Sequence, residues 1–376
     1  MKYKFLTVIV GVPLLAWLIF TACEAPNQPT ITAENDPNPT GLSAATVSAI
    51  DPAEGYLKDI VTITGSGFNT TPQFNLVAFG TKTAKIMSVT DNELKVRAPN
   101  ISDETVSVKV AIKGSETWSN EVDFTFKLAL QVIDEEIAWP NGVDEDDDGN
   151  VYIGSAGDEI IYQIAPDGTK SEFAAVPISG SMKFGPQKYL YVCLQNEGKI
   201  VRISPDGSTI EDVVEVESPV YFDWDQNKNM YIISNSVGVM KFDGSAVTQV
   251  AEIGSPKSCR VFGEYLYVTD IDESRMLRYH ITASGLEDET VILEGDALQS
   301  VEFDINGTIY YNLAWETSLY TLAADGTEEV LYEGELMTPM RYMTFKNKSI
   351  YLVYPGWGDV GMVMKAYIGV EQAPRY

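Results

Sequence analysis

The chain has 376 residues, and its hydrophobic fraction of 45% and aromatic fraction of 11% are typical of a globular protein rather than a disordered one. It carries 26 Lys and Arg residues against 54 Asp and Glu residues, so its net charge is −28. Nucleic acid and anionic membrane surfaces repel such a chain, and we expect neither as a direct partner.

The N-terminus has the pattern of a secretory signal. Lys2 and Lys4 precede a continuous apolar run from Phe5 to Phe20, and Thr21-Ala22-Cys23 follows. The pattern predicts a signal peptide over residues 1–23. The small residues before Cys23 resemble the lipobox of bacterial lipoproteins. The resemblance implies a lipid anchor on Cys23 and a place in the bacterial cell envelope, at the outer membrane, on its periplasmic or its outer surface. The alternatives are a plain cleaved signal and an uncleaved anchor.

Two segments with different composition follow. Residues 24–45 are rich in Pro, Asn, Thr, Ala and Ser and have no hydrophobic period, so they predict a flexible linker. Over residues 46–126, short β-rich runs alternate with Gly, Pro and Asn, which is typical of an all-β sandwich.

Particular runs in this second segment carry a family resemblance. They are "VTITGSGF" at 61–68, "VAFG" at 77–80 and "ELKVRAP" at 93–99. They resemble the IPT/TIG family of immunoglobulin-like domains. The resemblance implies a spacer or docking module, and the segment shows no catalytic motif.

Residues 127–376 repeat. A tyrosine that follows an apolar residue recurs at intervals of 39, 40, 36, 43 and 41 residues, at Tyr152, Tyr191, Tyr231, Tyr267, Tyr310 and Tyr351. A period near 40 with about four strands in each unit is typical of a β-propeller, and six tyrosines predict six blades. The run "PNGVDEDDDGNVYIGSAGDEIIYQIAPDGT" resembles NHL-type propellers and, more distantly, the gluconolactonase/regucalcin superfamily.

The last repeat has no outer strand of its own. Segment 127–138, in contrast, precedes the first inner strand and belongs to no unit. We therefore expect this segment to supply the outer strand of the sixth blade. The predicted fold is all-β: an immunoglobulin-like β-sandwich (IPT/TIG) followed by a six-bladed β-propeller.

An acidic turn in the first repeat raises the question of a metal. Asp144, Asp146, Asp148 and Gly149 match the opening of a calcium loop, but Ser155 stands where a closing Glu is needed. The equivalent turns of other repeats carry fewer charges, as at Asp225 and Asp304. We therefore interpret the segment as a hairpin turn, with calcium as the alternative, and we expect no other cofactor.

Catalytic machinery is not visible in the repeats. Asn141 matches the "PNG" piece of gluconolactonase-like proteins, which hold a divalent metal at the mouth of the channel. The corresponding positions of the other blades are Ser179, Val220, Lys257, Gln299 and Met340. They include no carboxylate, and Lys257 repels a cation. His280 is the only histidine, and it lies within a repeat strand. We expect a protein without enzymatic activity, and the alternative is a metal-dependent lactonase-like hydrolase.

Aromatic residues predict a binding face instead. In a propeller, the loops after the second strands share one face with the links between blades. Trp139, Trp315, Tyr354 and Trp357 fall on that face in three consecutive blades. Exposed aromatic planes suit stacking on sugar rings. Candidate hydrogen-bonding residues beside them are Asn141, Asn312 and Arg341.

These residues predict a site for a polysaccharide or an oligosaccharide. One alternative is a protein–protein scaffold or adhesin that contacts partner surface proteins through the same face. The other is that the aromatic side chains fold inward as loop packing.

Overall fold

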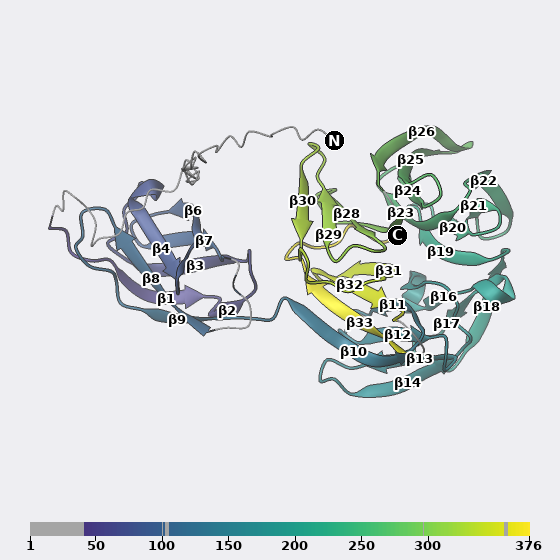
Figure 1. The fold of residues 1–376 in the computed structure, drawn as a ribbon, viewed down its shortest axis with the longest axis horizontal. Helices are drawn as coiled ribbons and strands as arrows, with labels where there is room; N and C mark the ends of the chain where they lie inside the picture. Colours follow the sequence, from purple (N-terminus) through teal and green to yellow (C-terminus); the bar gives the residue numbers. More distant parts are fainter. Residues whose placement is uncertain (1–40, 100, 102–104, 296, 357–359) are drawn as a thin grey trace, which may run out of the picture. The chain divides into compact units, whose positions relative to one another are not determined.

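The computed structural model describes residues 41–99, 101, 105–295, 297–356 and 360–376. The predicted signal peptide, with the lipidation site Cys23, lies outside the described residues, as does most of the predicted linker 24–45. The chain divides into two compact units, and Phe124–Tyr376 belongs to the larger one (Figure 1). Across the described residues, no helix has both the length and the apolar character that a membrane span requires.

The N-terminal strands form the two sheets of an immunoglobulin-like sandwich. The first sheet has the order β1 (Thr46–Asp51), β3 (Ile60–Ser66), β7 (Glu93–Arg97) and β6 (Lys85–Val89). The second has the order β2 (Glu54–Gly55), β9 (Val122–Phe126), β8 (Thr105–Ile112), β4 (Asn75–Phe79) and β5 (Lys82–Thr83). Val61 and Ile63, at alternate positions of β3, are fully buried. Successive side chains of a strand point to opposite faces, so this alternation gives the sheet one apolar face for the core.

The C-terminal part forms six four-stranded antiparallel sheets, which are the six predicted blades (Figure 1). The inner strands are β11 (Pro140–Glu145), β15 (Met182–Phe184), β19 (Pro219–Trp224), β23 (Pro256–Phe262), β27 (Leu298–Phe303) and β31 (Tyr342–Lys346). The second strands are β12 (Val151–Ser155), β16 (Leu190–Leu194), β20 (Met230–Ser234), β24 (Tyr265–Asp270), β28 (Ile309–Leu313) and β32 (Ser349–Tyr354).

The third strands are β13 (Ile160–Ile164), β17 (Lys199–Ile203), β21 (Gly238–Phe242), β25 (Arg275–Thr282), β29 (Leu319–Leu322) and β33 (Val360–Tyr367). The outer strands are β14 (Lys170–Ala175), β18 (Ile210–Glu215), β22 (Val247–Ala251), β26 (Gly285–Glu294), β30 (Glu328–Leu331) and β10 (Leu130–Ala138).

The ring closes where the sequence predicted. Strand β10 precedes the first blade but pairs antiparallel with β33 of the sixth, from Leu130 opposite Ala366 to Ala138 opposite Val360. The first inner strand, β11, packs against the last, β31. Closure gives the sixth blade four strands like the others and places it against the first, which is how a propeller limits its exposed strand edges.

The acidic turn of the first blade is one of a recurring set of hairpin turns. Asp146 Oδ1 accepts the backbone N–H groups of Asp148 and Asn150, both at 2.9 Å. Asp304 Oδ1 accepts the N–H groups of Asn306 and Thr308 at 2.8 and 2.9 Å in the fifth blade. The repeat tyrosine of the same blade donates its hydroxyl to this aspartate, from Tyr152 to Asp146 at 3.1 Å and from Tyr310 to Asp304 at 3.3 Å. The turn and the tyrosine therefore recur together, because the aspartate of the turn accepts the hydrogen bond that the buried tyrosine hydroxyl donates.

The inner strands also carry charged residues that form a ring around the axis of the propeller. Each repeat tyrosine pairs with one inner-strand residue, and these partners in blade order are Asp144, Lys183, Asp223, Arg260, Glu302 and Thr344. The first five alternate in sign and are buried. Lys183 Nζ lies 3.0 Å from Asp223, whose other oxygen lies 2.5 Å from Arg260, and Arg260 Nε lies 2.7 Å from Glu302.

The C-terminal tail supplies the charge that the sixth blade lacks. Arg375 contacts Asp144 at 2.7 Å and donates to the carbonyl of Phe345, next to Thr344, also at 2.7 Å. Upstream, Ala373 N–H donates to Phe303 O at 2.8 Å. We call the five charged partners and Arg375 the charge ring. It holds three acidic and three basic side chains, so its net charge is zero.

Candidate functional site

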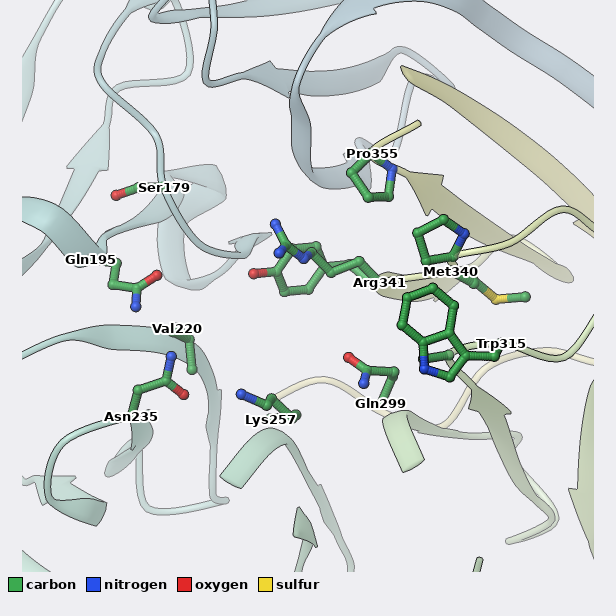
Figure 2. Close-up of a pocket in the computed structure, with 13 residues that line it drawn as sticks. Ser179, Gln195, Val220, Asn235, Lys257, Gln299, Trp315, Met340, Arg341 and Pro355 are labelled. Atoms are coloured by element: carbon green, nitrogen blue, oxygen red, sulfur yellow. The ribbon is translucent and has the colours of Figure 1, made fainter. Parts of the chain in front are cut away.

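A pocket of about 410 Å³ opens at the ends of the inner strands where the chain enters them. We call it the entry pocket (Figure 2). Its lining residues are Ser179, Gln195, Val220, Asn235, Lys257, Gln299, Ala314, Trp315, Pro339, Met340, Arg341, Tyr342 and Pro355. They include all five positions that the repeat aligned with Asn141. The remaining side chains come mainly from the loops that follow the second strands.

The two sides of the entry pocket differ in chemistry. Figure 2 shows Trp315, Met340 and Pro355 on one side and Ser179, Gln195 and Asn235 on the other. Trp315 is 62% exposed, which is unusual for so large an apolar ring. The pocket thus offers an apolar platform opposite a set of hydroxyl and amide groups.

Two cationic side chains, Lys257 and Arg341, also line the pocket, and no Asp or Glu of the described residues belongs to the lining. The backbone of Arg341 is fixed, because its N–H donates to Val353 O at 3.0 Å and its carbonyl accepts from Ser300 Oγ at 3.3 Å. Its side chain is exposed and extends toward the middle of the pocket (Figure 2). Burial raises the pKa of neighbouring Tyr342 to about 12, although the charge of Arg341 opposes that rise. Tyr342 therefore stays protonated at neutral pH.

The charge ring lies below the entry pocket. Lys257 and Arg260, like Gln299 and Glu302, are three residues apart on one strand, which is a rise of about 10 Å. Burial alone would raise the pKa of Asp223, but Arg260 and Lys183 outweigh it and lower that pKa to about 2. The five ring side chains that the inner strands supply are buried, so they fill the axis of the propeller below the entry pocket.

Two of the seven predicted ligand-binding residues, Trp315 and Arg341, line the entry pocket. Trp139 is 45% exposed but is not part of the lining, and Asn141 is buried outside it. Trp357 lies outside the described residues. Among the described residues, the structure therefore brings together one indole and one guanidinium at the entry pocket.

Asn312 and Tyr354 are not accessible, so the expectation that they offer ligand contacts is corrected. Asn312 is fully buried, and its amide accepts from Ser300 N–H and donates to Met340 O, both at 3.1 Å. Asn312 thus stabilises the backbone of the lining residue Met340 from the buried side. Tyr354 is 2% exposed because it is the last residue of β32, a strand buried between β31 and β33, and its ring packs in the core of the sixth blade.

Sequence reasoning missed the polar half of the lining. Gln195 and Asn235 directly follow the second strands β16 and β20, the same kind of position that led to Trp315. Loops after the second strands share one face of the propeller. Considering amide side chains in these loops, as well as aromatic ones, could have found both residues. Pro339 and Ala314 carry no comparable signal.

The calcium alternative does not fit the side chains of the acidic turn. Asp144 is engaged by Arg375 and also accepts the N–H of Phe184 at 2.7 Å, while Asp146 holds its own turn. In the part of the chain that the structure describes, no group of three or more His, Cys, Asp or Glu side chains is placed to hold a metal ion. His280 lies in β25, with its ring 5.3 Å from that of Tyr265, and does not line the entry pocket.

The fold and the pocket define an all-β protein in which an immunoglobulin-like sandwich accompanies a six-bladed propeller. Residues 45–126 match the IPT/TIG domain family, which confirms the resemblance for that segment. No curated protein is significantly similar to the chain in sequence.

Several solved structures share the fold. One is a Bacteroides thetaiotaomicron protein of unknown function, 15% identical, with a TM-score of 0.54 over 88% of this chain and 99% of that one. Another is an auxiliary nutrient binding protein from Bacteroides ovatus, 13% identical, with a TM-score of 0.52 over 90% of this chain and 100% of that one. A gluconolactonase from Xanthomonas campestris is 14% identical, with a TM-score of 0.55 over 63% of this chain and 89% of that one. At such identities the likeness establishes the fold alone.

Proposed function

We propose that this protein is a non-catalytic binding protein that takes up a saccharide in the entry pocket. The observation that carries the proposal is the exposed indole of Trp315 facing hydroxyl and amide groups across a pocket of about 410 Å³. That volume lies in the range of small-molecule sites. A sugar ring has an apolar face of C–H groups and a rim of hydroxyls, so it matches both sides of the pocket.

Binding is favoured over hydrolysis by the side chains present. Among the described residues, the lining contains no carboxylate, imidazole or thiol that could act as a general base or nucleophile. Two cations also make the pocket a poor site for the divalent metal of a lactonase-like enzyme. The likeness to the Bacteroides ovatus protein, described as an auxiliary nutrient binding protein, extends over 100% of that chain and supports a binding role.

The cellular setting is part of the proposal. The signal segment and Cys23 suggest a lipid-anchored protein of the bacterial envelope, in which the linker and the IPT/TIG domain follow the lipidated residue in the sequence and precede the propeller. Mass spectrometry of the mature N-terminus tests this point, because acyl chains on Cys23 support it and an unmodified N-terminus contradicts it.

Replacing Trp315 with alanine tests the site. We expect Trp315→Ala to weaken saccharide binding about tenfold, since the indole supplies the apolar platform. The measurement is titration calorimetry of wild type and variant with the saccharide that binds best in a screen of oligosaccharides. Trp139→Ala is the matched control, because it removes an indole of similar exposure that does not line the pocket.

Three outcomes separate the candidate functions. Loss of affinity in Trp315→Ala but not in Trp139→Ala supports the proposal. Equal binding by all three proteins contradicts the site. A protein that binds no saccharide but retains a partner protein in a pull-down supports the scaffold alternative.

A further inference from the structure

We propose that the ligand of the entry pocket is an acidic saccharide, whose carboxylate or sulfate group is held by Arg341 with Lys257. The inference rests on the proposed function and adds the chemical class of the ligand. The charged residues that line the pocket are basic, whereas the protein as a whole is acidic.

Acidic residues outnumber basic ones in this chain by 54 to 26, yet the thirteen lining residues include two cations and no carboxylate. Among the described residues, neither Lys257 nor Arg341 forms an ion pair. Two positive charges that line one pocket without a counter-ion repel one another. A bound anion removes that repulsion, so these side chains favour an anionic ligand.

A second pocket in the propeller provides an internal comparison. It has a volume of about 330 Å³ and opens at the opposite ends of the inner strands, where three of its four cations are paired within the protein. Lys346 and Lys188 lie 3.0 and 3.5 Å from Asp147, and Arg375 lies 2.7 Å from Asp144. These three cations have partners within the protein, whereas Lys257 and Arg341 form no ion pair among the described residues.

The placement of the two cations suits one ring-bound acid group. Arg341 extends from the sixth blade toward the middle of the pocket, and Lys257 lines it from the fourth blade (Figure 2). A guanidinium offers paired N–H donors that match the two oxygens of a carboxylate or sulfate, and an ammonium adds a point charge. Trp315 can then support the sugar ring while Gln195, Asn235 and Gln299 bind its hydroxyls.

The test compares matched ligands that differ only in charge. The ligands are short oligosaccharides carrying one uronic acid, the same oligosaccharides with that carboxyl reduced to an alcohol, and short oligosaccharides carrying one sulfate. Short ligands with a single charge keep repulsion from the net charge of −28 small. Calorimetric titration of the full chain gives the affinities. We expect at least one acidic ligand to bind more tightly than its neutral counterpart.

Arg341→Gln should then lower the affinity for the acidic ligand about 10- to 100-fold and leave that for the neutral one nearly unchanged. Lys257→Gln should give a smaller loss of the same kind. Arg341→Lys, which keeps the positive charge but lacks the paired N–H donors of the guanidinium, should recover part of the affinity. Lys228→Gln is the control, because it removes an exposed cation that lines only the opposite pocket.

The outcomes distinguish the two proposals. If neutral saccharides bind as well as acidic ones, or Arg341→Gln binds acidic ligands normally, the acidic-ligand inference fails while the saccharide site stands. If neither class binds wild-type protein, the proposed function fails and the inference fails with it.

Discussion

Asp223 is fully buried between two cations, Lys183 of the second blade and Arg260 of the fourth. Isolated in the core, such a carboxylate would be strongly destabilising. The two ion pairs keep it charged, and its second oxygen also accepts the N–H of Val261 at 2.8 Å. Its charge is therefore part of the native structure, and stability depends on it.

The pH dependence of the propeller follows from this residue. The pKa of Asp223 is about 2 in the folded protein and near 3.9 in an unfolded chain, so its contribution to stability is complete above about pH 4 and is lost as the pH falls toward 2. We expect that contribution to be on the order of 2 to 3 kcal/mol. The free energy of unfolding of wild type and Asp223→Asn, measured from pH 6 to pH 2, should show a difference that shrinks by this amount. A constant difference would contradict the assignment.

At the scale of single residues, the sequence predicted exposed binding residues near loops, but it did not show which of the candidate residues are buried in strands. Trp315 follows a second strand, a position that a propeller places on one face, and Arg341 was expected beside the aromatic residues; both line the entry pocket. Asn312 and Tyr354 share the same stretches but end in the core, because one residue along a strand changes the side that a side chain faces. The sequence alone does not resolve that one-residue register.

Two elements at the ends of the propeller sequence hold the ring together, and they do so differently. Strand β10 adds backbone pairing to the sixth blade, and the missing outer strand of the last repeat predicted this role. The tail instead adds one side chain, Arg375, to the charge ring. It has no repeat pattern, because its partners are single residues contributed by different blades, so nothing in the sequence pointed to it.

The tail can be tested by removing its charge. Arg375→Met leaves Asp144 buried without its cation, and we expect a loss of about 3 to 5 kcal/mol in the free energy of unfolding. Denaturant titration measures this loss. Arg202→Met is the matched control, because the pair of Arg202 with Glu211 is partly exposed and should contribute less than about 1 kcal/mol. Equal stability of Arg375→Met and wild type would show that the tail does not fasten the ring.

At the scale of the whole molecule, the propeller could be predicted because the same sequence pattern occurs in each of its blades. Six tyrosines spaced near 40 residues predicted six blades, and the structure shows six. The entry pocket has no such redundancy. Among the described residues, it is lined from five blades by side chains that the repeat does not conserve, such as Lys257, Gln299 and Arg341. Its position was therefore predictable, but its lining was predictable only in part.

A crystal structure of the protein with the best acidic oligosaccharide bound tests the central claim most directly. The account predicts a sugar ring against the indole of Trp315 and its acid group within hydrogen-bonding distance of the guanidinium of Arg341. An oligosaccharide bound elsewhere, with the entry pocket empty, would contradict it.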